Sequence, residues 1–536
     1  MKFIKNFISI LKKNWLLVFI LLSVFLLGIY RINHLIWWDE MLSLYIAFQP
    51  LSSIWSLKIH PNGFYFNKLP PFYETVLHFL LVFSEENYVL IGRLFSIFLT
   101  IVSLILIFYI AKFLFDRKVG IIATFLAAFN YTYLYHCRWI KYTPLLNVLT
   151  LFSFYLFLKM VKEKRVFICY SLPLVCINTL ILYTFYFGIF VIWVEFVLAI
   201  FILRAKKDLL KVFIWLCCPL LLFIPWLKHF IYDCFKETAL TSFLDNTFSW
   251  NNFFKFFYLR LSKGIFYNPI LFFLYSFILI WALGYGIKKI IQKEENGQWV
   301  ISLCTVLLLP IVSINLLTLA EYLKGDCIRA RYFFNYIFSI FILGGVFFRK
   351  VNFLKIFLFS IICILSVHSA YKYLVSSSLS GYPDLEKLVD ISLQIKNFPV
   401  SQKEKVVIHI EDPLLIPTFV YYFYGPRYMR LVCVPHLANK KGMDILSELK
   451  PNYKIYFDVA GIKKYHLFKS IPEFVNADYL ILIYSTFFAH YFGGEWRFLY
   501  EKKLQEYNLL DRITLLKKDA GNNFILEIYK VNKPNQ

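Results

Sequence analysis

The chain has 536 residues, of which 60% are hydrophobic and only 17% are charged, and its mean hydropathy is +0.62. This composition excludes a soluble globular protein of this size and predicts a polytopic α-helical membrane protein. The net charge of +24 would suit a nucleic-acid-binding protein, but many lysines and arginines stand in short clusters between hydrophobic segments, which is typical of membrane topology instead.

Apolar stretches long enough to cross a bilayer recur through the first 372 residues, where a spanning helix needs about 20 apolar residues. We expect about eleven spans, near residues 15–30, 88–115, 119–135, 143–161, 166–182, 185–203, 211–228, 266–286, 298–318, 331–348 and 353–372. Basic residues precede the first of them as in a signal peptide, but no small-residue cleavage site follows. The first helix is therefore expected to be retained.

The positions of the basic residues predict the orientation of the chain in the membrane. The short connections after the second, fourth, sixth, eighth and tenth spans carry lysines and arginines, as in 117–118, 162–165, 204–207, 288–289 and 349–350. The positive-inside rule assigns them, with the N-terminus, to the cytoplasmic side of a cell membrane. The loop 31–87, the loop 229–265 and the tail 373–536 then lie outside the cytosol, away from nucleotide-activated donors. Any activated donor must reach them through the lipid phase.

The tail 373–536 is expected to form a small extracytosolic α/β domain beside the membrane domain 1–372. Short β-branched or aromatic runs predict strands, and two stretches predict helices. The expected strands are 404–410, 429–434, 454–459 and 479–484, the helices are 384–397 and 495–507, and 513–517 with 524–529 form a closing hairpin. The tail has neither a glycine-rich phosphate loop nor a nucleophile elbow.

An acidic pair, Asp39-Glu40, follows Trp37-Trp38 just beyond the first span. The membrane interface prefers aromatic and basic residues, so two adjacent carboxylates at this place indicate chemistry on a polar substrate. The alternative is a purely structural pair that caps a short interfacial helix beginning at Met41.

Further polar landmarks stand in the same expected outer segments. They are Asn67-Lys68-Leu69-Pro70-Pro71-Phe72-Tyr73, then Arg93, then Tyr135-His136-Cys137-Arg138-Trp139-Ile140-Lys141-Tyr142, and finally Arg329-Ala330-Arg331-Tyr332. Taken in this order with the acidic pair, they resemble the GT-C superfamily of polyprenyl-phosphate-sugar-dependent glycosyltransferases. The nearest likeness is to the branch of the protein O-mannosyltransferases, the lipid A aminoarabinose transferases and the lipopolysaccharide-core transferases. The resemblance covers the whole membrane domain.

The resemblance implies an inverting glycosyltransferase that uses a polyprenyl-phosphate-linked sugar. Transfer requires a base for the acceptor hydroxyl and cations for the departing phosphate, and a phosphate leaves without a general acid. Asp39 is the implied base, and Glu40 orients it or binds acceptor or metal. The implied phosphate-binding residues are Lys68, Arg138, Lys141, Tyr142, Arg331 and Tyr332. The acceptor is a glycolipid, a cell-envelope glycan or a protein.

The chain departs from the family pattern at two places. Many members have Lys or His directly before the Pro-Pro pair, where this chain has Leu69, so the role of Lys68 depends on local geometry. Several members carry a second aspartate where this chain has Lys141 and Tyr142. A metal-dependent variant is therefore not expected, and neither His60 nor His136 has a third ligand at useful spacing. No cofactor and no nucleic-acid partner is expected.

Other interpretations remain open. Arg138, Lys141, Arg329 and Arg331 also suit interfacial anchors that reach lipid headgroups. Glu195 is an acid deep in an apolar helix, as expected of a proton-coupled transporter or lipid-linked-sugar flippase. A solitary acid of this kind is also readily kept protonated or paired with a neighbouring helix. An O-antigen polymerase or ligase is a further alternative, although such proteins rely on arginines and histidine without an early acidic pair.

Overall fold

The structure is a computed structural model in which the chain divides into two compact units. It describes residues 14–30, 32, 36, 38–56, 70–82, 87–163, 168–203, 205–236, 268–322, 330–350, 352–375, 391, 393–395, 397, 406–410, 453–457, 478–485, 513–520 and 524–531. The first unit comprises Met1–Ile32, Asn67–Tyr73 and Leu90–Ser377, and the second comprises Asn33–Phe66, Glu74–Val89 and Ser378–Gln536.

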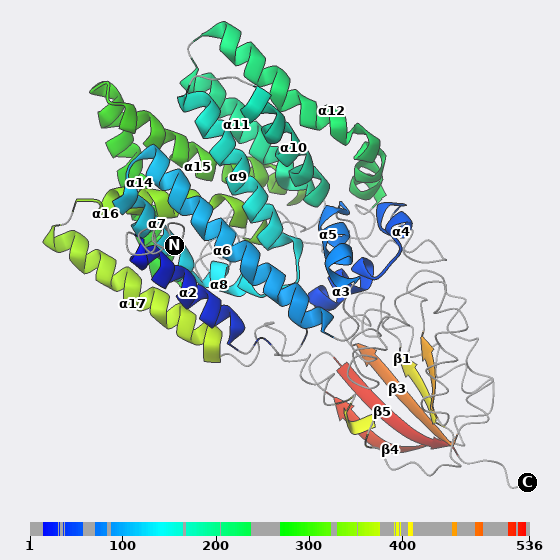
Figure 1. Cartoon of the computed structure of the whole chain (residues 1–536). Helices are drawn as coiled ribbons and strands as arrows, with labels where there is room; N and C mark the ends of the chain where they lie inside the picture. Colours follow the sequence, from blue (N-terminus) through cyan, green and yellow to red (C-terminus); the bar gives the residue numbers. More distant parts are fainter. Residues whose placement is uncertain are drawn as a thin grey trace, which may run out of the picture. The chain divides into compact units, whose positions relative to one another are not determined.

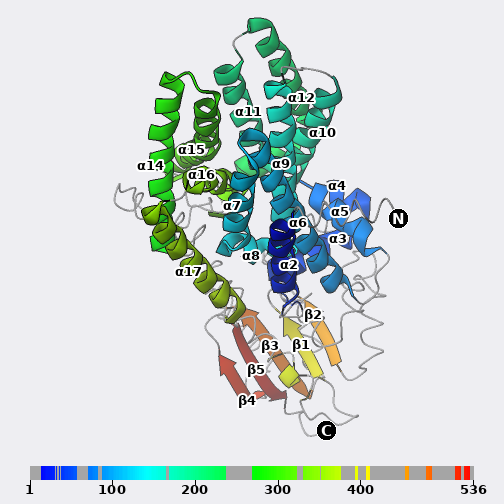
Figure 2. The ribbon, with the colours of Figure 1, turned by 60° about the vertical axis from the view of Figure 1, so that its left-hand side comes forward.

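The first unit is helical (Figures 1 and 2). Its elements are α2 (Trp15–Ile29), α6 (Tyr88–Leu114), α7 (Arg117–Ala128), α8 (Tyr131–Cys137), α9 (Tyr142–Lys162), α10 (Ile168–Thr184), η1 (Tyr186–Gly188), α11 (Ile189–Ile202), α12 (Lys206–Lys236), α14 (Pro269–Ile291), α15 (Glu295–Tyr322), η4 (Ala330–Tyr336), α16 (Phe338–Phe348) and α17 (Phe353–Val375). Helices α9 to α12 lie side by side in both views.

Each of the eleven expected spans overlaps a helix of this unit. Six of the described helices contain a stretch long and apolar enough to cross a membrane: Tyr88–Leu114, Tyr142–Lys162, Lys206–His229, Pro269–Ile291, Glu295–Ser313 and Phe353–Tyr371. Shorter apolar helices lie in four of the five remaining ranges, 15–30, 166–182, 185–203 and 331–348. The chain is thus a helical protein with several apolar membrane helices, and the number of about eleven spans stays a prediction.

Two expected spans are interrupted. The range 119–135 is divided into α7 and α8, because Asn130 has an extended backbone and its Oδ1 accepts a hydrogen bond from the Thr132 amide at 2.9 Å, which caps a new helix. The range 331–348 begins as the 3₁₀ segment η4 and becomes α-helical only at Phe338. The second interruption, η4, contains Arg331 and Tyr332, two of the residues predicted to bind the donor phosphate.

Helix α16 occupies the centre of the first unit, and all of its residues are buried. It packs against α7, α14 and α15. Glycines allow the close approach to α7, because a methyl group on Gly345 would lie 2.7 Å from the Val119 carbonyl oxygen and one on Gly344 would lie 2.8 Å from Leu126. Small residues at helix contacts of this kind are typical of membrane bundles.

The second unit contains three short helices from the first loop: α3 (Trp38–Ala47), α4 (Leu51–Ser56) and α5 (Phe72–Leu81), whose first two residues belong to the other unit. Ile46 of α3 and Ile54 of α4 form a small buried core. His78 of α5 contacts the last carbonyl of α3, with 2.7 Å between Nδ1 and the Ala47 oxygen. These contacts fix α3, the helix that carries the acidic pair.

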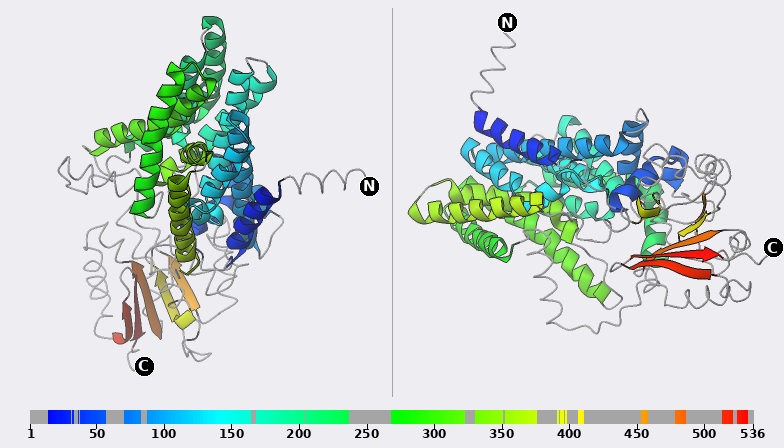
Figure 3. Two further views of the ribbon diagram at one scale, coloured as in Figure 1. Left: turned by 90° about the vertical axis from the view of Figure 1, so that its left-hand side faces the viewer. Right: turned by 90° about the horizontal axis from the view of Figure 1, so that it is seen from below.

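The second unit also contains a five-stranded sheet of order β2-β1-β3-β5-β4 (Figure 3). Its strands are β1 (Val406–Ile410), β2 (Tyr453–Phe457), β3 (Tyr479–Ser485), β4 (Ile513–Ala520) and β5 (Phe524–Val531). β1 pairs in parallel with β2 and β3, whereas β3–β5 and β5–β4 are antiparallel. The register aligns Ile408, Ile481 and Ile528 across the sheet, and the last two are buried.

Three of the four separate strand predictions and the closing hairpin agree with these strands. The expected strand 429–434 and the expected helix 495–507 lie outside the described residues, and only 391, 393–395 and 397 of the expected helix 384–397 are described. An α/β domain for the whole tail therefore stays a prediction, whereas its mixed sheet is observed.

Candidate functional site

The acidic pair lies in the first turn of α3, which begins at Trp38. The capping interpretation placed the pair before a helix beginning at Met41, so its helix boundary is wrong by three residues. Carboxylates in a first turn face the positive end of the helix dipole and favour the helix. Glu40 is buried, with 1% of its surface exposed, and Ser43 one turn later on the same face is buried as well. Glu40 is therefore a buried carboxyl group at the start of α3.

The connection between α8 and α9 brings three predicted phosphate-binding residues together in the first unit. Arg138 follows α8, Lys141 is the N-cap residue of α9, and Tyr142 is the first residue of that helix. All three are buried, with 2%, 6% and 3% of their surfaces exposed. Their phosphate-binding role stays a prediction.

Each of these residues has a defined contact. The Lys141 Nζ lies 4.9 Å from the centre of the Trp139 ring, in a cation–π geometry. The Tyr142 ring stacks on Phe185, with centroids 4.9 Å apart. Arg138 Nη1 donates a hydrogen bond of 2.6 Å to the Tyr30 carbonyl. No local sequence pattern predicts the contact between Tyr142 and Phe185, because it depends on two helix ends meeting in space.

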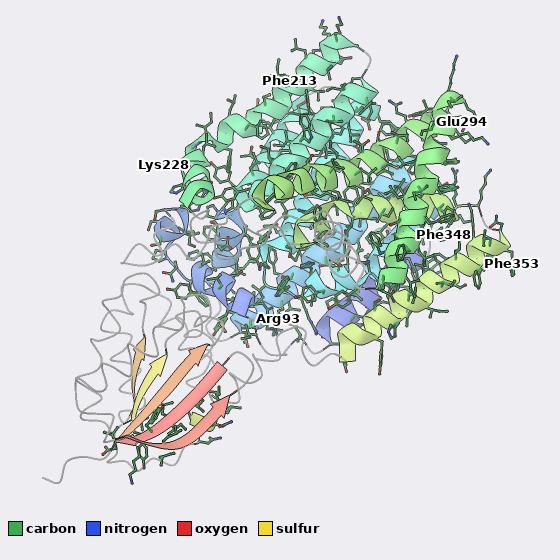
Figure 4. All side chains as sticks on the ribbon, turned by 180° about the vertical axis from the view of Figure 1, so that it is seen from behind. Arg93, Phe213, Lys228, Glu294, Phe348 and Phe353 are labelled. Atoms are coloured by element: carbon green, nitrogen blue, oxygen red, sulfur yellow. The ribbon has the colours of Figure 1, made fainter. Side chains whose placement is uncertain are left out.

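Two arginines bind the chain where α2 ends. Besides Arg138 on Tyr30, the fully buried Arg93 of α6 donates to the Ile32 carbonyl at 2.5 Å (Figure 4). Carbonyls at a helix C-terminus lack intrahelical partners and carry partial negative charge, so cations are favourable there. Arg138 thus has a structural contact in addition to its predicted phosphate role.

Replacing Arg93 with methionine is expected to lower the free energy of unfolding by about 1.5–3 kcal/mol, the range for hydrogen bonds to charged groups. Thermal unfolding in detergent measures this change. The control is Arg349→Met, which breaks a 2.6 Å ion pair with Asp116 at the surface; solvent screening limits that loss to about 1 kcal/mol or less. Equal losses in the two variants would contradict the anchoring role of Arg93.

Segment η4 packs against α9 and contacts aromatic side chains of α8. Its Phe334 ring lies 4.6 Å from His136 and 4.9 Å from Tyr133, centroid to centroid. His136 Nδ1 is also 3.1 Å from the Thr143 hydroxyl of α9. Arg331 and Tyr332 are the second and third residues of η4, three and two residues before Phe334, so the backbone brings them to the same part of the first unit.

The structure describes the remaining predicted site residues only in part. The side chains of Asp39, Arg331 and Tyr332 lie outside what the structure describes, as does the whole of Lys68. Asp39 and Glu40 belong to the second unit and Arg138, Lys141 and Tyr142 to the first. The joint action of these groups on one substrate stays a prediction.

No metal centre emerges from the described ranges, and the buried Cys137 is not an activated thiol. They contain no group of three or more His, Cys, Asp or Glu side chains placed to hold a metal ion. Burial raises the pKa of the Cys137 thiol to about 12. That thiol is therefore protonated at neutral pH and is a poor nucleophile.

Comparison with known proteins gives likenesses in structure alone, because no model of a protein family and no curated protein sequence matches the chain. ArnT from Cupriavidus metallidurans in the apo state is 12% identical, with 96% of this chain and 98% of that chain covered and a TM-score of 0.54. The same protein bound to undecaprenyl phosphate is 12% identical, with 97% and 98% covered and a TM-score of 0.53.

An oligosaccharyltransferase from Archaeoglobus fulgidus, solved with Zn and sulfate, is 14% identical over 76% of this chain, with a TM-score of 0.47. The chain spans 61% of the length of that protein. The likeness to ArnT extends over almost the entire length of both chains, so the chain has the GT-C fold that the order of its motifs resembles.

Proposed function

We propose that this GT-C-fold protein is a membrane glycosyltransferase that moves a sugar from a polyprenyl-phosphate carrier to an acceptor outside the cytosol, with inversion at the anomeric carbon. The observation that carries the proposal is the likeness to ArnT over nearly the whole of both chains, one of whose structures holds undecaprenyl phosphate. A fold alone does not define a reaction. The support must therefore also come from the site.

The start of α9 has the features of a phosphate-binding site. The N-terminus of a helix presents backbone N–H groups and a partial positive charge, and α9 is 21 residues long. Lys141 adds a cation at its N-cap, and Arg138 adds another three residues earlier. Lys141 also contacts the Trp139 ring, and Arg138 donates a hydrogen bond to the Tyr30 carbonyl. Buried cations attract an anion strongly because the surroundings have a low dielectric constant.

The remaining predicted groups complete the proposed donor site. Segment η4 would contribute Arg331 and Tyr332 to this donor site, and the first loop would contribute Lys68. The guanidinium of Arg331 suits phosphate oxygens because its planar fork donates two parallel hydrogen bonds. The carrier's polyprenyl tail would remain in the bilayer beside the apolar helices.

Asp39 is the proposed general base. A carboxylate takes the proton of the acceptor hydroxyl as the oxygen attacks the anomeric carbon, and the bond to the phosphate oxygen breaks on the opposite face. The phosphate leaves as an anion and needs no acid. Glu40, buried in α3 directly beside Asp39 in the chain, is the proposed positioning residue. No cofactor enters this scheme.

The orientation follows from the basic connections, with the N-terminus cytoplasmic and the loop 31–87 and the tail 373–536 outside the cytosol. Nucleotide-linked sugars do not reach that side, which favours a lipid-linked donor. The proposed acceptors are a glycolipid, a cell-envelope glycan or a protein.

Mass spectrometry of envelope lipids, glycans and proteins from cells with and without the gene tests the proposal. The expected result is one sugar missing from one class of acceptor in the deletion strain, together with accumulation of its polyprenyl-phosphate donor. Expression of the wild-type gene should restore the sugar. Unchanged glycosylation in all three fractions, with no donor accumulating, would rule the proposal out.

A further inference from the structure

Three buried polar side chains form a closed ring inside the first unit, away from the α8–α9 connection in the chain. Ser153 of α9, Asn178 of α10 and Glu195 of α11 each have 0% of their surface exposed. The Ser153 Oγ lies 2.6 Å from Asn178 Oδ1 and 2.6 Å from Glu195 Oε1. The third side of the ring is 2.7 Å long, between Asn178 Nδ2 and Glu195 Oε2.

The number of hydrogens in this ring fixes the charge of Glu195. Three contacts of hydrogen-bond length need three hydrogens between the atoms. The amide of Asn178 supplies one, the hydroxyl of Ser153 supplies one, and an ionised carboxylate supplies none. Without a third hydrogen, two oxygen atoms would face each other at 2.6 Å with only lone pairs between them.

The result does not depend on how the amide of Asn178 is assigned. With the amide oxygen and nitrogen of Asn178 as assigned in the structure, the carboxylic acid of Glu195 donates to Ser153 Oγ. The Ser153 hydroxyl then donates to Asn178 Oδ1, and the Asn178 N–H donates back to Glu195 Oε2. If the amide oxygen and nitrogen are exchanged, the acid donates to the amide oxygen, the amide donates to Ser153, and the hydroxyl donates to Glu195. Both directions require one proton on Glu195.

The surroundings of Glu195 also favour the neutral form. Helix α11 packs against α9, α10, α12, α15 and η1. Among the described residues, Glu195 makes no ion pair, and the titratable group that faces it is the Tyr336 phenol of η4. An ionised carboxylate would be a buried charge without a cation in an apolar bundle, which is costly.

We propose that Glu195 is held as a neutral carboxylic acid and that its proton closes a ring of hydrogen bonds locking α9, α10 and α11 together. The ring fixes the relative position of three helices whose ends carry Tyr142, Phe185 and η1. Such a proton is part of the packing, in contrast to the proton of a transporter, which must exchange with water on each side of the membrane. This inference is independent of the proposed function.

Infrared spectroscopy of purified protein at neutral pH tests the protonation directly. The wild type is expected to show the carbonyl stretch of a protonated carboxylic acid, and Glu195→Gln should lose that band. The control is Glu163→Gln, which changes an exposed acid that accepts a hydrogen bond from Tyr170; it should leave the band intact. A Glu195→Gln spectrum identical to the wild type in this region would overturn the proposal.

Thermal unfolding tests the ring. The glutamine amide places a donor nitrogen and an acceptor oxygen where a protonated acid has its donor and acceptor oxygens, so Glu195→Gln should unfold near the wild-type temperature. Glu195→Ala and Ser153→Ala should each unfold several degrees lower. If Glu195→Ala fails to fold, the comparison of Glu195→Gln with Ser153→Ala decides. Glu195→Gln unfolding as early as Ser153→Ala would show that the ring needs a carboxylate and would overturn the neutral form.

Discussion

Asp39→Asn is expected to lower the turnover of sugar transfer by about 10²- to 10⁴-fold, the contribution typical of a general base. Asparagine has a side chain of the same size, but its amide cannot take the proton from the hydroxyl of the acceptor substrate. Its position in the first turn of α3 makes the change mild for folding, because asparagine is tolerated at helix starts. The measurement is turnover of reconstituted protein with a polyprenyl-phosphate-linked sugar, together with thermal unfolding of both proteins.

The matched control is Asp208→Asn. Asp208 is also an acid in the first turn of a helix, α12, at the end expected to face the cytoplasm. The same substitution there should leave turnover unchanged. Wild-type turnover in Asp39→Asn would remove Asp39 from its proposed role, whereas equal losses in both variants would indicate a general effect of removing first-turn charge.

Lys141→Ala is expected to weaken binding of the lipid donor by about 10- to 100-fold, as the loss of one hydrogen bond to a charged group implies. The expected effect is larger than for a surface lysine because the side chain is buried at the N-cap of α9. Titration of undecaprenyl phosphate into protein in detergent measures the dissociation constant. Arg331→Ala is expected to weaken binding in the same direction.

The control for Lys141→Ala is Lys355→Ala. Lys355 also lies over a tryptophan, with its Nζ 5.4 Å from the Trp281 ring centre, but at the start of α17. The Lys355→Ala variant therefore loses a cation–π contact of the same kind but leaves the proposed donor site unchanged. Unchanged donor affinity in both Lys141→Ala and Arg331→Ala would remove these residues from the phosphate site, whatever their effect on stability.

Glu195 shows why an acid in an apolar helix needs its neighbours before it is assigned a function. The sequence makes it a candidate for proton-coupled transport. In the structure its oxygens are bonded by Ser153 and Asn178, and all three side chains are buried. These contacts favour a fixed proton and give the transporter alternative no support.

The elements themselves were largely readable from the sequence. Long apolar runs predicted the helices, and short β-branched or aromatic runs predicted β1, β2, β3 and the hairpin of β4 with β5. The break between α7 and α8 was missed because hydrophobicity continues through it. Asn130, a residue preferred at helix N-caps, was the local signal that marks it.

The sequence by itself determined that this is a membrane protein, which segments are helical, and where acidic and basic residues stand along the chain. Hydrophobicity and local backbone preference suffice for that, since both act within one segment. Only the tertiary structure decided that Arg138 binds the carbonyl of Tyr30, 108 residues away in sequence, and that the Glu195 carboxyl contacts Ser153 and Asn178 of two other helices. Partners so far apart are chosen by helix packing, and no local pattern records them.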